Sequence, residues 1–314
     1  MGEMTMTAEN IIIGKNTKYP LKGILTLPDN AAKPVPAVVF VHGSGSSNKD
    51  EKVGRLTPFR DLAEGLAARG IASVRYDKRS FTHGFKMVLS KTPITVKEET
   101  IEDAVLAAEL LRQDPRIDPE NIFIIGHSMG GMLAPRIDAE GGNFRGLILM
   151  AGTPRKLEEV MVGQFGDMLP TTKGLARRVL QKQADQLTKQ FAGLYELSDE
   201  EAKQVKLGGG TTLYYFKEMG EHPASDYLTG LEKPLLICQG SKDFQVKLRE
   251  DFGAYQELLK GKANVTFKLY EGLNHAFVPA VYGSIAMAKK EYSVEQHIGP
   301  EVLEDLAEWI HSNC

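Results

Sequence analysis

Short apolar runs alternate with longer amphipathic segments along most of the 314-residue chain. The run Val35–Val41 (V-P-A-V-V-F-V) is almost continuously apolar, which is typical of a strand buried on both faces of a parallel sheet. Since strands that alternate with helices form parallel sheets with right-handed crossovers, the pattern predicts an α/β fold. The predicted strands cover residues 11–13, 21–27, 35–41, 71–76, 122–125, 145–150, 234–239 and 265–270, the first two as an antiparallel pair.

The amphipathic patterns between these runs predict the flanking helices. One pattern stops at Gly70, a residue type that is favoured just after the last turn of a helix. The segment Asp114–Asn121 (D-P-R-I-D-P-E-N) combines two prolines with polar residues and predicts a turn. The predicted helices of the core cover residues 59–69, 96–112, 129–139 and 300–309.

One stretch interrupts the alternation. From about Pro154 to Leu231 the sequence predicts no strand, and helical patterns cover residues 156–168, 173–195, 199–206 and 213–219. Because the stretch is too long for a loop in a compact domain, we interpret it as an inserted helical cap. The predicted core is therefore 1–153 with 232–314, and the predicted cap, or lid, is 154–231. We interpret the triplet Gly208–Gly210 as a flexible joint rather than a phosphate-binding loop, because no strand precedes it and no Lys-Ser or Lys-Thr pair follows it.

Ser128 is the predicted nucleophile, at the centre of the pentapeptide G-H-S-M-G. The apolar strand Ile122–Ile125 precedes the pentapeptide directly, and an apolar helix follows it. This context predicts a sharp strand-to-helix turn that exposes the serine hydroxyl above the sheet edge in a strained backbone conformation. Gly126 and Gly130 suit that turn because a Cβ at either position would collide with neighbouring backbone. The alternative is a tight turn that needs glycines for structural reasons alone.

A glycine turn after an early strand supplies a candidate oxyanion hole. Val35–Val41 is followed by H-G-S-G, and such a turn can direct a backbone N–H toward the nucleophile. We predict that the second donor is the N–H of the residue after the nucleophile, Met129. For the first donor we choose Ser44, with Gly45 as the alternative. Without the downstream nucleophile motif, an ordinary Gly-Ser turn would be the preferred interpretation.

His275 is the predicted general base among seven histidines. It lies in the loop E-G-L-N-H-A-F after the strand Val265–Tyr270, and the expected order along the chain is Ser, then Asp or Glu, then His. His297 is the rival, but it follows Glu295 and Gln296 at a position that reads as solvated. The remaining histidines have structural or surface interpretations: His42 as a hydrogen-bonding residue of the glycine turn, His83 and His222 in polar loops, His127 as a neighbour of the nucleophile, and His311 in the last helical turn.

Asp243 is the predicted acid that orients His275. It is the first carboxylate in the loop G-S-K-D-F-Q-V after the strand Leu235–Gln239. Its role would be to hold the imidazole tautomer and to stabilise the imidazolium. Asp251 is the nearest alternative, but it falls in the helical pattern that follows.

These motifs together resemble the α/β-hydrolase superfamily. H-G-S-G, Y-D-K-R (Tyr76–Arg79), G-H-S-M-G-G, Q-G-S-K-D-F-Q-V and G-L-N-H-A-F look most like its serine esterases related to dienelactone hydrolase, cinnamoyl (feruloyl) esterase and the acyl-CoA thioesterase/acyltransferase group. The resemblance covers about Lys33 to Trp309. It implies a mostly parallel eight-stranded sheet flanked by helices, the triad and the two oxyanion donors chosen above. In similar sequences a glycine often follows Y-D-K-R, whereas Ser80 stands here, so a different loop shape is expected near the site.

The resulting hypothesis is a serine carboxylesterase that needs no metal and no organic cofactor. Tyr214 and Tyr215 lie in an aromatic cap segment and are candidate substrate-binding residues, although a role in the core of the cap explains them equally well. Phe277, two residues after His275, is a third candidate for the pocket wall. Hydroxycinnamate or other small aromatic esters are the favoured substrates, and short-chain aliphatic esters come next.

Three other functions stay open. A peptidase or aminopeptidase would need a site for a peptide terminus, which acidic cap residues could supply, although they read better as a solvated helix start: Glu196, Asp199, Glu200 and Glu201. An acyl-CoA thioesterase or acyltransferase is the second, but related acyltransferases tend to use cysteine as nucleophile. A non-catalytic binding protein is the third, and the order of the triad residues argues against it.

The amino-acid composition limits the classes of binding partner that are expected. A net charge of −3 gives no strong field, so nucleic acid and anionic membranes are poor partners, and a small-molecule ester is the expected one. No apolar run approaches the roughly 18 residues of a membrane span, and Met1–Asn10 does not resemble a secretory signal. Cys238 reads as a buried apolar residue and Cys314 as a mobile terminal one, with a bridge between them left open. Cytoplasmic residence is the default expectation. The oligomeric state is not readable, and a homodimer is compatible with the sequence.

Overall fold

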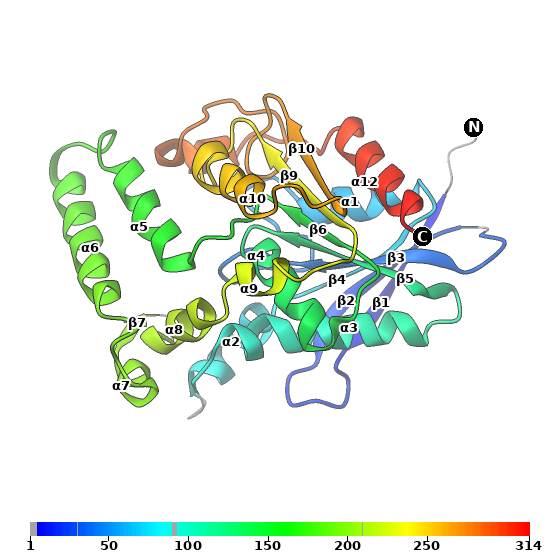
Figure 1. Ribbon diagram of the computed structural model, residues 1–314, viewed down its shortest axis with the longest axis horizontal. Coiled ribbons are helices and arrows are strands. Elements are labelled where there is room, and N and C mark those ends of the chain that lie inside the picture. Colours follow the sequence, from blue (N-terminus) through cyan, green and yellow to red (C-terminus); the bar gives the residue numbers. More distant parts are fainter. Residues whose placement is uncertain (1–4, 30, 90–92, 209) are drawn as a thin grey trace.

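An eight-stranded, mostly parallel sheet forms the centre of the computed structural model, which describes all residues except 1–4, 30, 90–92 and 209. The strand order is β1-β2-β4-β3-β5-β6-β9-β10, and only the pairs that involve β2 are antiparallel (Figure 1). The strands are β1 Met6–Ile13, β2 Leu21–Pro28, β3 Val35–Val41, β4 Ala72–Tyr76, β5 Ile117–His127, β6 Leu147–Met150, β9 Leu235–Gly240 and β10 Val265–Tyr270. The predicted α/β fold is confirmed.

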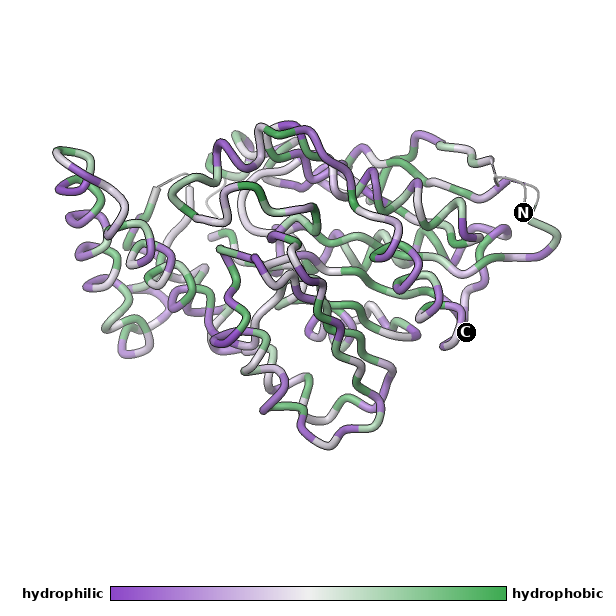
Figure 2. Tube along the Cα trace, turned by 90° about the horizontal axis from the view of Figure 1, so that it is seen from above, coloured by the Kyte–Doolittle hydropathy of each residue, from purple (hydrophilic) through white to green (hydrophobic). Residues whose placement is uncertain are grey.

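The central strands are buried on both faces, as their continuous apolar runs predict. In β3, Val39 and Val41 enter the core on one face, whereas Val38 and Phe40 enter the core on the other. Neighbouring strands repeat this alternation because side chains along a strand point to opposite faces. Hydrophobic residues accordingly follow the strands through the middle of the molecule (Figure 2).

Helices cover both faces of the sheet. Apolar residues of α3, α4 and α10 pack into the core on one face, and those of α1 and α12 pack into the core on the other. These helices are α1 Pro58–Ala67, α3 Glu102–Gln113, α4 Met129–Ile137, α10 Gly253–Leu258 and α12 Pro300–Ser312. Shorter helical turns complete the core: Lys97–Ile101, Asp138–Gly142, Leu248–Phe252, Ile285–Met287 and α11 Ala288–Glu291.

Between β6 and β9 the described residues form five helices, the first four of which lie to the left in Figure 1, whereas the last lies beside α4 near the centre. They are α5 Leu157–Met168, α6 Gly174–Ala192, α7 Asp199–Gln204, α8 Leu213–Glu221 and α9 Ala224–Leu228. The expectation that this stretch holds no strand is wrong in one place, since β7 (Lys206–Gly208) pairs with β8 (Thr211–Thr212). Gly210 has a φ of 86°, which glycine adopts freely, and turns the chain between the two strands. Gly209, the middle of the predicted glycine joint, lies outside the described residues.

Three core elements differ from the sequence prediction. Strand β5 starts at Ile117, inside the predicted turn, because Ile117 pairs with Val35 of β3 before a register shift. Residues 96–112 form a π-helical turn, Lys97–Ile101, followed by α3 rather than one helix. The segment after Tyr76–Arg79 is a helix, α2 (Arg79–Leu89), not a loop, and it includes His83.

Two smaller expectations concern cysteines and membrane spans. Cys238 is fully buried in β9, as predicted, and both Cys238 and Cys314 are free thiols. Within the described residues, no helix combines the length and the apolar character that crossing a bilayer requires.

Candidate active site

Ser128 lies at the sharp turn between β5 and α4. Its backbone has φ 54° and ψ −118°, a left-handed conformation that is strained for a residue with a side chain. The two flanking glycines make the turn fit: a Cβ at Gly126 would overlap the Gly130 carbonyl oxygen, and a Cβ at Gly130 would overlap the Val41 carbonyl oxygen. The G-H-S-M-G segment therefore has the strand-turn-helix geometry that the sequence predicts.

Asp243 and His275 meet at the same edge of the sheet, on the loops after β9 and β10. The Nδ1 atom of His275 lies 2.8 Å from Oδ2 of Asp243. The other Asp243 oxygen accepts the backbone N–H groups of Gln245 (2.8 Å) and Val246 (2.9 Å). Because the carboxylate only accepts, the His275 proton lies on Nδ1, and Nε2 has a free lone pair that can accept a proton.

Ser128 and His275 line one cavity of about 210 Å³, together with Gly43, Ser44 and His127. The structure thus brings the three predicted catalytic residues to one place, the carboxyl edge of the parallel sheet. This is the edge at which α/β proteins place ligands.

The two alternative residues lie elsewhere. His297 has a side chain that is 72% exposed and contacts Asp61 at 3.0 Å. Asp251 is buried and accepts hydrogen bonds from the Thr153 hydroxyl (2.7 Å) and the Lys247 N–H (2.6 Å). Within the part of the chain that the structure describes, neither His297 nor Asp251 lines a cavity that contains Ser128.

The glycine turn after β3 packs directly against Ser128, since a Cβ at Gly43 would lie 3.1 Å from the Ser128 Cβ. The Gly43 N–H donates to the Glu51 carboxylate and is therefore occupied. The Ser44 N–H, in contrast, donates to no group in the described part of the chain. Met129 is the first residue of α4, whose leading N–H groups have no partner within the helix. Ser44 and Met129 thus present free donors beside the serine, and Gly45 lines the larger cavity next to it.

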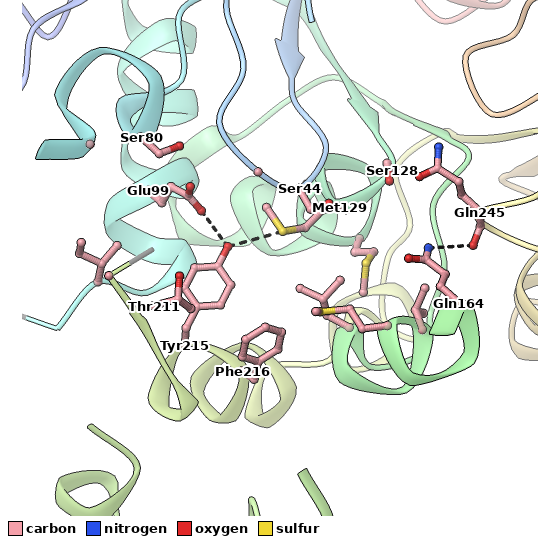
Figure 3. Close-up of a pocket in the computed structure, with 18 of the residues that line it drawn as sticks. Ser44, Ser80, Glu99, Ser128, Met129, Gln164, Thr211, Tyr215, Phe216 and Gln245 are labelled. Atoms are coloured by element: carbon pink, nitrogen blue, oxygen red, sulfur yellow. Dashed lines mark hydrogen bonds between the residues drawn. The ribbon is translucent and has the colours of Figure 1, made fainter. Parts of the chain in front are cut away.

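A second, larger cavity of about 360 Å³ begins at Ser128 and extends under α5 and α8. Figure 3 shows Ser128 and Met129 in its centre, with Glu99 and Tyr215 to one side and Gln164 to the other. Its apolar wall comes largely from α4, α5 and α8: Met132, Leu157, Val160, Met161 and Phe216.

Of the three predicted substrate-binding residues, the structure brings only Tyr215 to this cavity. Tyr214 points elsewhere, and the Lys203 ammonium lies 4.7 Å from its ring centre. Phe277, whose φ is 57°, is 1% exposed and packs against Tyr270 in the core. Tyr214, predicted to contact the substrate, and Phe277, predicted to form part of the pocket wall, therefore do not line this cavity.

Sequence reasoning did not identify the polar end of the larger cavity. The Tyr215 hydroxyl donates to Oε2 of Glu99 (2.7 Å), and Oε1 of Glu99 lies 3.7 Å from the ammonium of Lys78. Burial lowers the pKa of Lys78, and the carboxylates of Glu99 and Glu51 oppose that shift. Burial and the neighbouring Glu99 raise the pKa of Tyr215 well above its usual value, so the phenol stays neutral. Lys78 belongs to the Y-D-K-R motif, but no sequence signal marks Glu99.

Comparisons with known proteins agree with this geometry. A family model described as "Alpha/beta hydrolase family" matches residues 38–282. Esterase EstD of Thermotoga maritima is 32% identical over 290 residues, which cover 92% of this chain and 65% of EstD. The chain thus spans about two thirds of the length of that curated relative.

Solved structures show the same fold at low sequence identity. Est1E from Butyrivibrio proteoclasticus is 16% identical with a TM-score of 0.56, over 97% of this chain and 98% of Est1E. A puromycin-hydrolyzing peptidase of Mycobacterium tuberculosis is also 16% identical with a TM-score of 0.58, over 99% of this chain and 39% of the peptidase. At such identities the likeness is one of fold.

Proposed function

The chain belongs to the alpha/beta hydrolase family, and from this premise we propose that it is a serine carboxylesterase with Ser128, His275 and Asp243 as its catalytic triad. One observation carries the proposal. Ser128 occupies a strained turn in the same cavity as His275, whose Nδ1 is bonded to the buried carboxylate of Asp243. The similarity to esterase EstD supports ester hydrolysis as the reaction.

The proposed reaction proceeds through an acyl-enzyme. Nε2 of His275 takes the Ser128 proton as Oγ attacks the ester carbonyl, and the N–H groups of Met129 and Ser44 stabilise the oxyanion. His275 then protonates the leaving alcohol. A water molecule, activated by the same imidazole, hydrolyses the acyl-enzyme and regenerates Ser128. Each step uses only groups of this chain and water.

We propose small aromatic or short acyl esters, with hydroxycinnamates favoured, as substrates. A cavity of about 360 Å³ suits an acyl group of that size. Its apolar wall suits an aromatic ring or a short alkyl chain. At its polar end, Lys78 balances the charge of Glu99, so this end suits a neutral hydroxyl that both donates and accepts hydrogen bonds.

The acidic cap residues do not supply a site for a peptide amine. Asp199 pairs with Lys217 at 2.6 Å, and Glu201 forms a capping box with Ser198 at the start of α7. In the part of the chain that the structure describes, the cavity at Ser128 is lined by none of the four acidic candidates, Glu196, Asp199, Glu200 and Glu201. This arrangement favours an esterase over an aminopeptidase.

The test combines active-site labelling with a substrate panel. We expect a fluorophosphonate probe to label the wild type and the control Ser293→Ala, whose serine is exposed on the surface, but not Ser128→Ala. Ser128→Ala should lose several orders of magnitude in kcat on p-nitrophenyl esters and methyl ferulate. Full activity in Ser128→Ala would overturn the proposal. Preferential cleavage of aminoacyl-naphthylamides or acyl-CoA thioesters would reassign the enzyme to a peptidase or a thioesterase.

A further inference from the structure

A second acid–histidine pair, outside the proposed triad, lines the same cavity of about 210 Å³ as Ser128 and His275. Nδ1 of His127 is 2.9 Å from Oε2 of Glu51, and both side chains are only 11% exposed. His127 precedes the nucleophile in the chain, and its Nε2 lies 2.9 Å from the backbone carbonyl oxygen of His275. The ring centres of His127 and His275 are 4.8 Å apart. The Glu51 carboxylate is therefore connected through one side chain to the loop that holds the proposed base.

The other oxygen of Glu51 holds the glycine turn. Oε1 accepts the N–H of Gly43 at 2.7 Å. The carbonyl of Gly43 in turn accepts the buried ammonium of Lys78 at 2.9 Å. The Gly43 carbonyl and the Ser44 N–H belong to the same planar peptide unit, so fixing the carbonyl also fixes the direction of the N–H. Glu51 and Lys78 thus set the orientation of the proposed oxyanion donor from its two sides.

The partners of the pair determine the direction in which its pKa values shift. Nε2 of His127 contacts the His275 carbonyl oxygen, and Nδ1 lies within ion-pair distance of the Glu51 carboxylate without a hydrogen bond between them, so the negative charge beside the ring favours its protonated form. Burial would lower the pKa of His127, but the Glu51 charge and the bond to the His275 carbonyl outweigh it, and the pKa is raised. For Glu51, burial is likewise outweighed by His127, and its pKa is lowered. Both shifts favour the charged forms of the two side chains.

Glu51 also adopts a strained backbone conformation. Its φ is 48°, in the left-handed region that few residues other than glycine occupy. Asn48 stabilises the turn, since its carbonyl accepts the Glu51 N–H (2.9 Å) and its side-chain oxygen accepts the Lys52 N–H (3.0 Å). Such strain persists where the surrounding structure requires one geometry. Here the geometry places both carboxylate oxygens where Gly43 and His127 need them.

From these contacts we propose that Glu51 and His127 are positioning residues that hold the oxyanion turn, the nucleophile turn and the His275 loop in one fixed arrangement. The proposal rests on the serine esterase function proposed above. Both residues line the cavity that contains Ser128, and the proposed role acts through their contacts with the oxyanion turn and the His275 loop. Their effect would appear in the transition state, because stabilisation of the oxyanion depends on donors that are already aligned before the reaction.

The test compares Glu51→Ala and Glu51→Gln with the wild type and with Glu257→Gln, whose side chain is 80% exposed and lines neither cavity at Ser128. Active sites are counted with a fluorophosphonate probe, so that kcat refers to folded enzyme only. For Glu51→Ala we expect kcat on a p-nitrophenyl ester to fall about 100-fold, with KM within about threefold, because misaligned donors fail chiefly in the transition state. Affinity for a trifluoromethyl ketone should fall in parallel.

Glu51→Gln keeps an acceptor for the Gly43 N–H, so we expect it to recover part of the lost kcat. A purely structural role would leave the folded Glu51→Ala enzyme as active as the wild type. The proposal is therefore overturned if, in Glu51→Ala, both kcat per titrated active site and the affinity for the trifluoromethyl ketone stay within about twofold of the wild-type values. If Glu51→Ala does not fold, the same criterion applies to Glu51→Gln. Absence of wild-type esterase activity would instead refute the proposed function, so the two failures are distinguishable.

Discussion

His275 donates its Nδ1 proton to Oδ2 of Asp243 over 2.8 Å, and the Asp243 side chain is fully excluded from solvent. The carboxylate is further fixed by the Gln239 side-chain amide at 2.9 Å and by backbone N–H groups. An isolated buried carboxylate would be costly, but this one is bonded on both oxygens. The pair is therefore built to hold one imidazole tautomer.

The first prediction follows from that tautomer. In Asp243→Asn the amide can donate to Nδ1, which would move the histidine proton to Nε2 and remove the lone pair that accepts the Ser128 proton. We expect kcat to fall on the order of 10⁴-fold at neutral pH with little change in fold. Steady-state kinetics on p-nitrophenyl esters measures this. Asp226→Asn, at an exposed position of α9, is the matched control, and equal activity in the two variants would contradict the assignment.

The polar end of the larger cavity gives the second prediction. Tyr215→Phe removes the hydroxyl that bonds Glu99, while Tyr214→Phe changes the neighbouring tyrosine outside the cavity. If Tyr215 and Glu99 bind a substrate hydroxyl, Tyr215→Phe should lower kcat/KM for a 4-hydroxycinnamate ester about tenfold relative to the cinnamate ester. Tyr214→Phe should leave that ratio unchanged. If the wild type, Tyr215→Phe and Tyr214→Phe all show the same ratio of kcat/KM for the two esters, this end of the cavity does not bind a substrate hydroxyl.

A third prediction concerns the nucleophile turn. A Cβ at Gly126 would overlap the Gly130 carbonyl, whereas a Cβ at Gly163, inside α5, meets only open space. Gly126→Ala should therefore destabilise the fold by about 1–3 kcal/mol or more. Gly163→Ala should stabilise it by up to about 1 kcal/mol, because alanine favours helix over glycine. Urea unfolding followed by circular dichroism compares the two, and similar midpoints would contradict the steric argument.

The features that the sequence predicts well are those in which neighbouring residues determine the structure. The apolar runs locate all eight strands of the main sheet, most clearly the central ones, where burial on both faces leaves few polar positions. The turn at Ser128 is equally local, since strand, glycines and helix follow one another directly. The topology then brings Asp243 and His275 to the same sheet edge.

Features that depend on distant contacts were not predictable. Helix α2 contains Thr82 and Gly84, which disfavour helix, yet it is anchored by Arg79, which pairs with the buried Asp103. Glu99 reaches the cavity from a π-helical turn and meets Tyr215, which is 116 positions away along the chain. No pattern in one sequence reports such a pairing. The same holds for Glu51 and His127, which lie far apart in the sequence and meet only in the tertiary structure.

The last prediction concerns acid stability and His42. Its ring is buried between Phe59 and Tyr76, and Nε2 contacts the Asn48 carbonyl at 3.0 Å. Burial, assisted by the Lys78 charge and opposed by Glu51 and Asp77, lowers the pKa of His42 to about 4 from the usual 6.5. Between these values the unfolded chain takes up a proton that the folded protein does not. This residue therefore reduces stability as the pH falls from about 6.5 toward 4, by about 3 kcal/mol in total.

In His42→Gln the amide can still donate to Asn48 but does not titrate. We expect this variant to be less stable than the wild type at pH 7, yet to lose about 2 kcal/mol less stability between pH 7 and pH 4.5, because the proton uptake of the unfolded state is removed. Free energies of unfolding in urea at both pH values measure the difference. A His42→Gln curve parallel to the wild type would show that other groups cause the acid sensitivity.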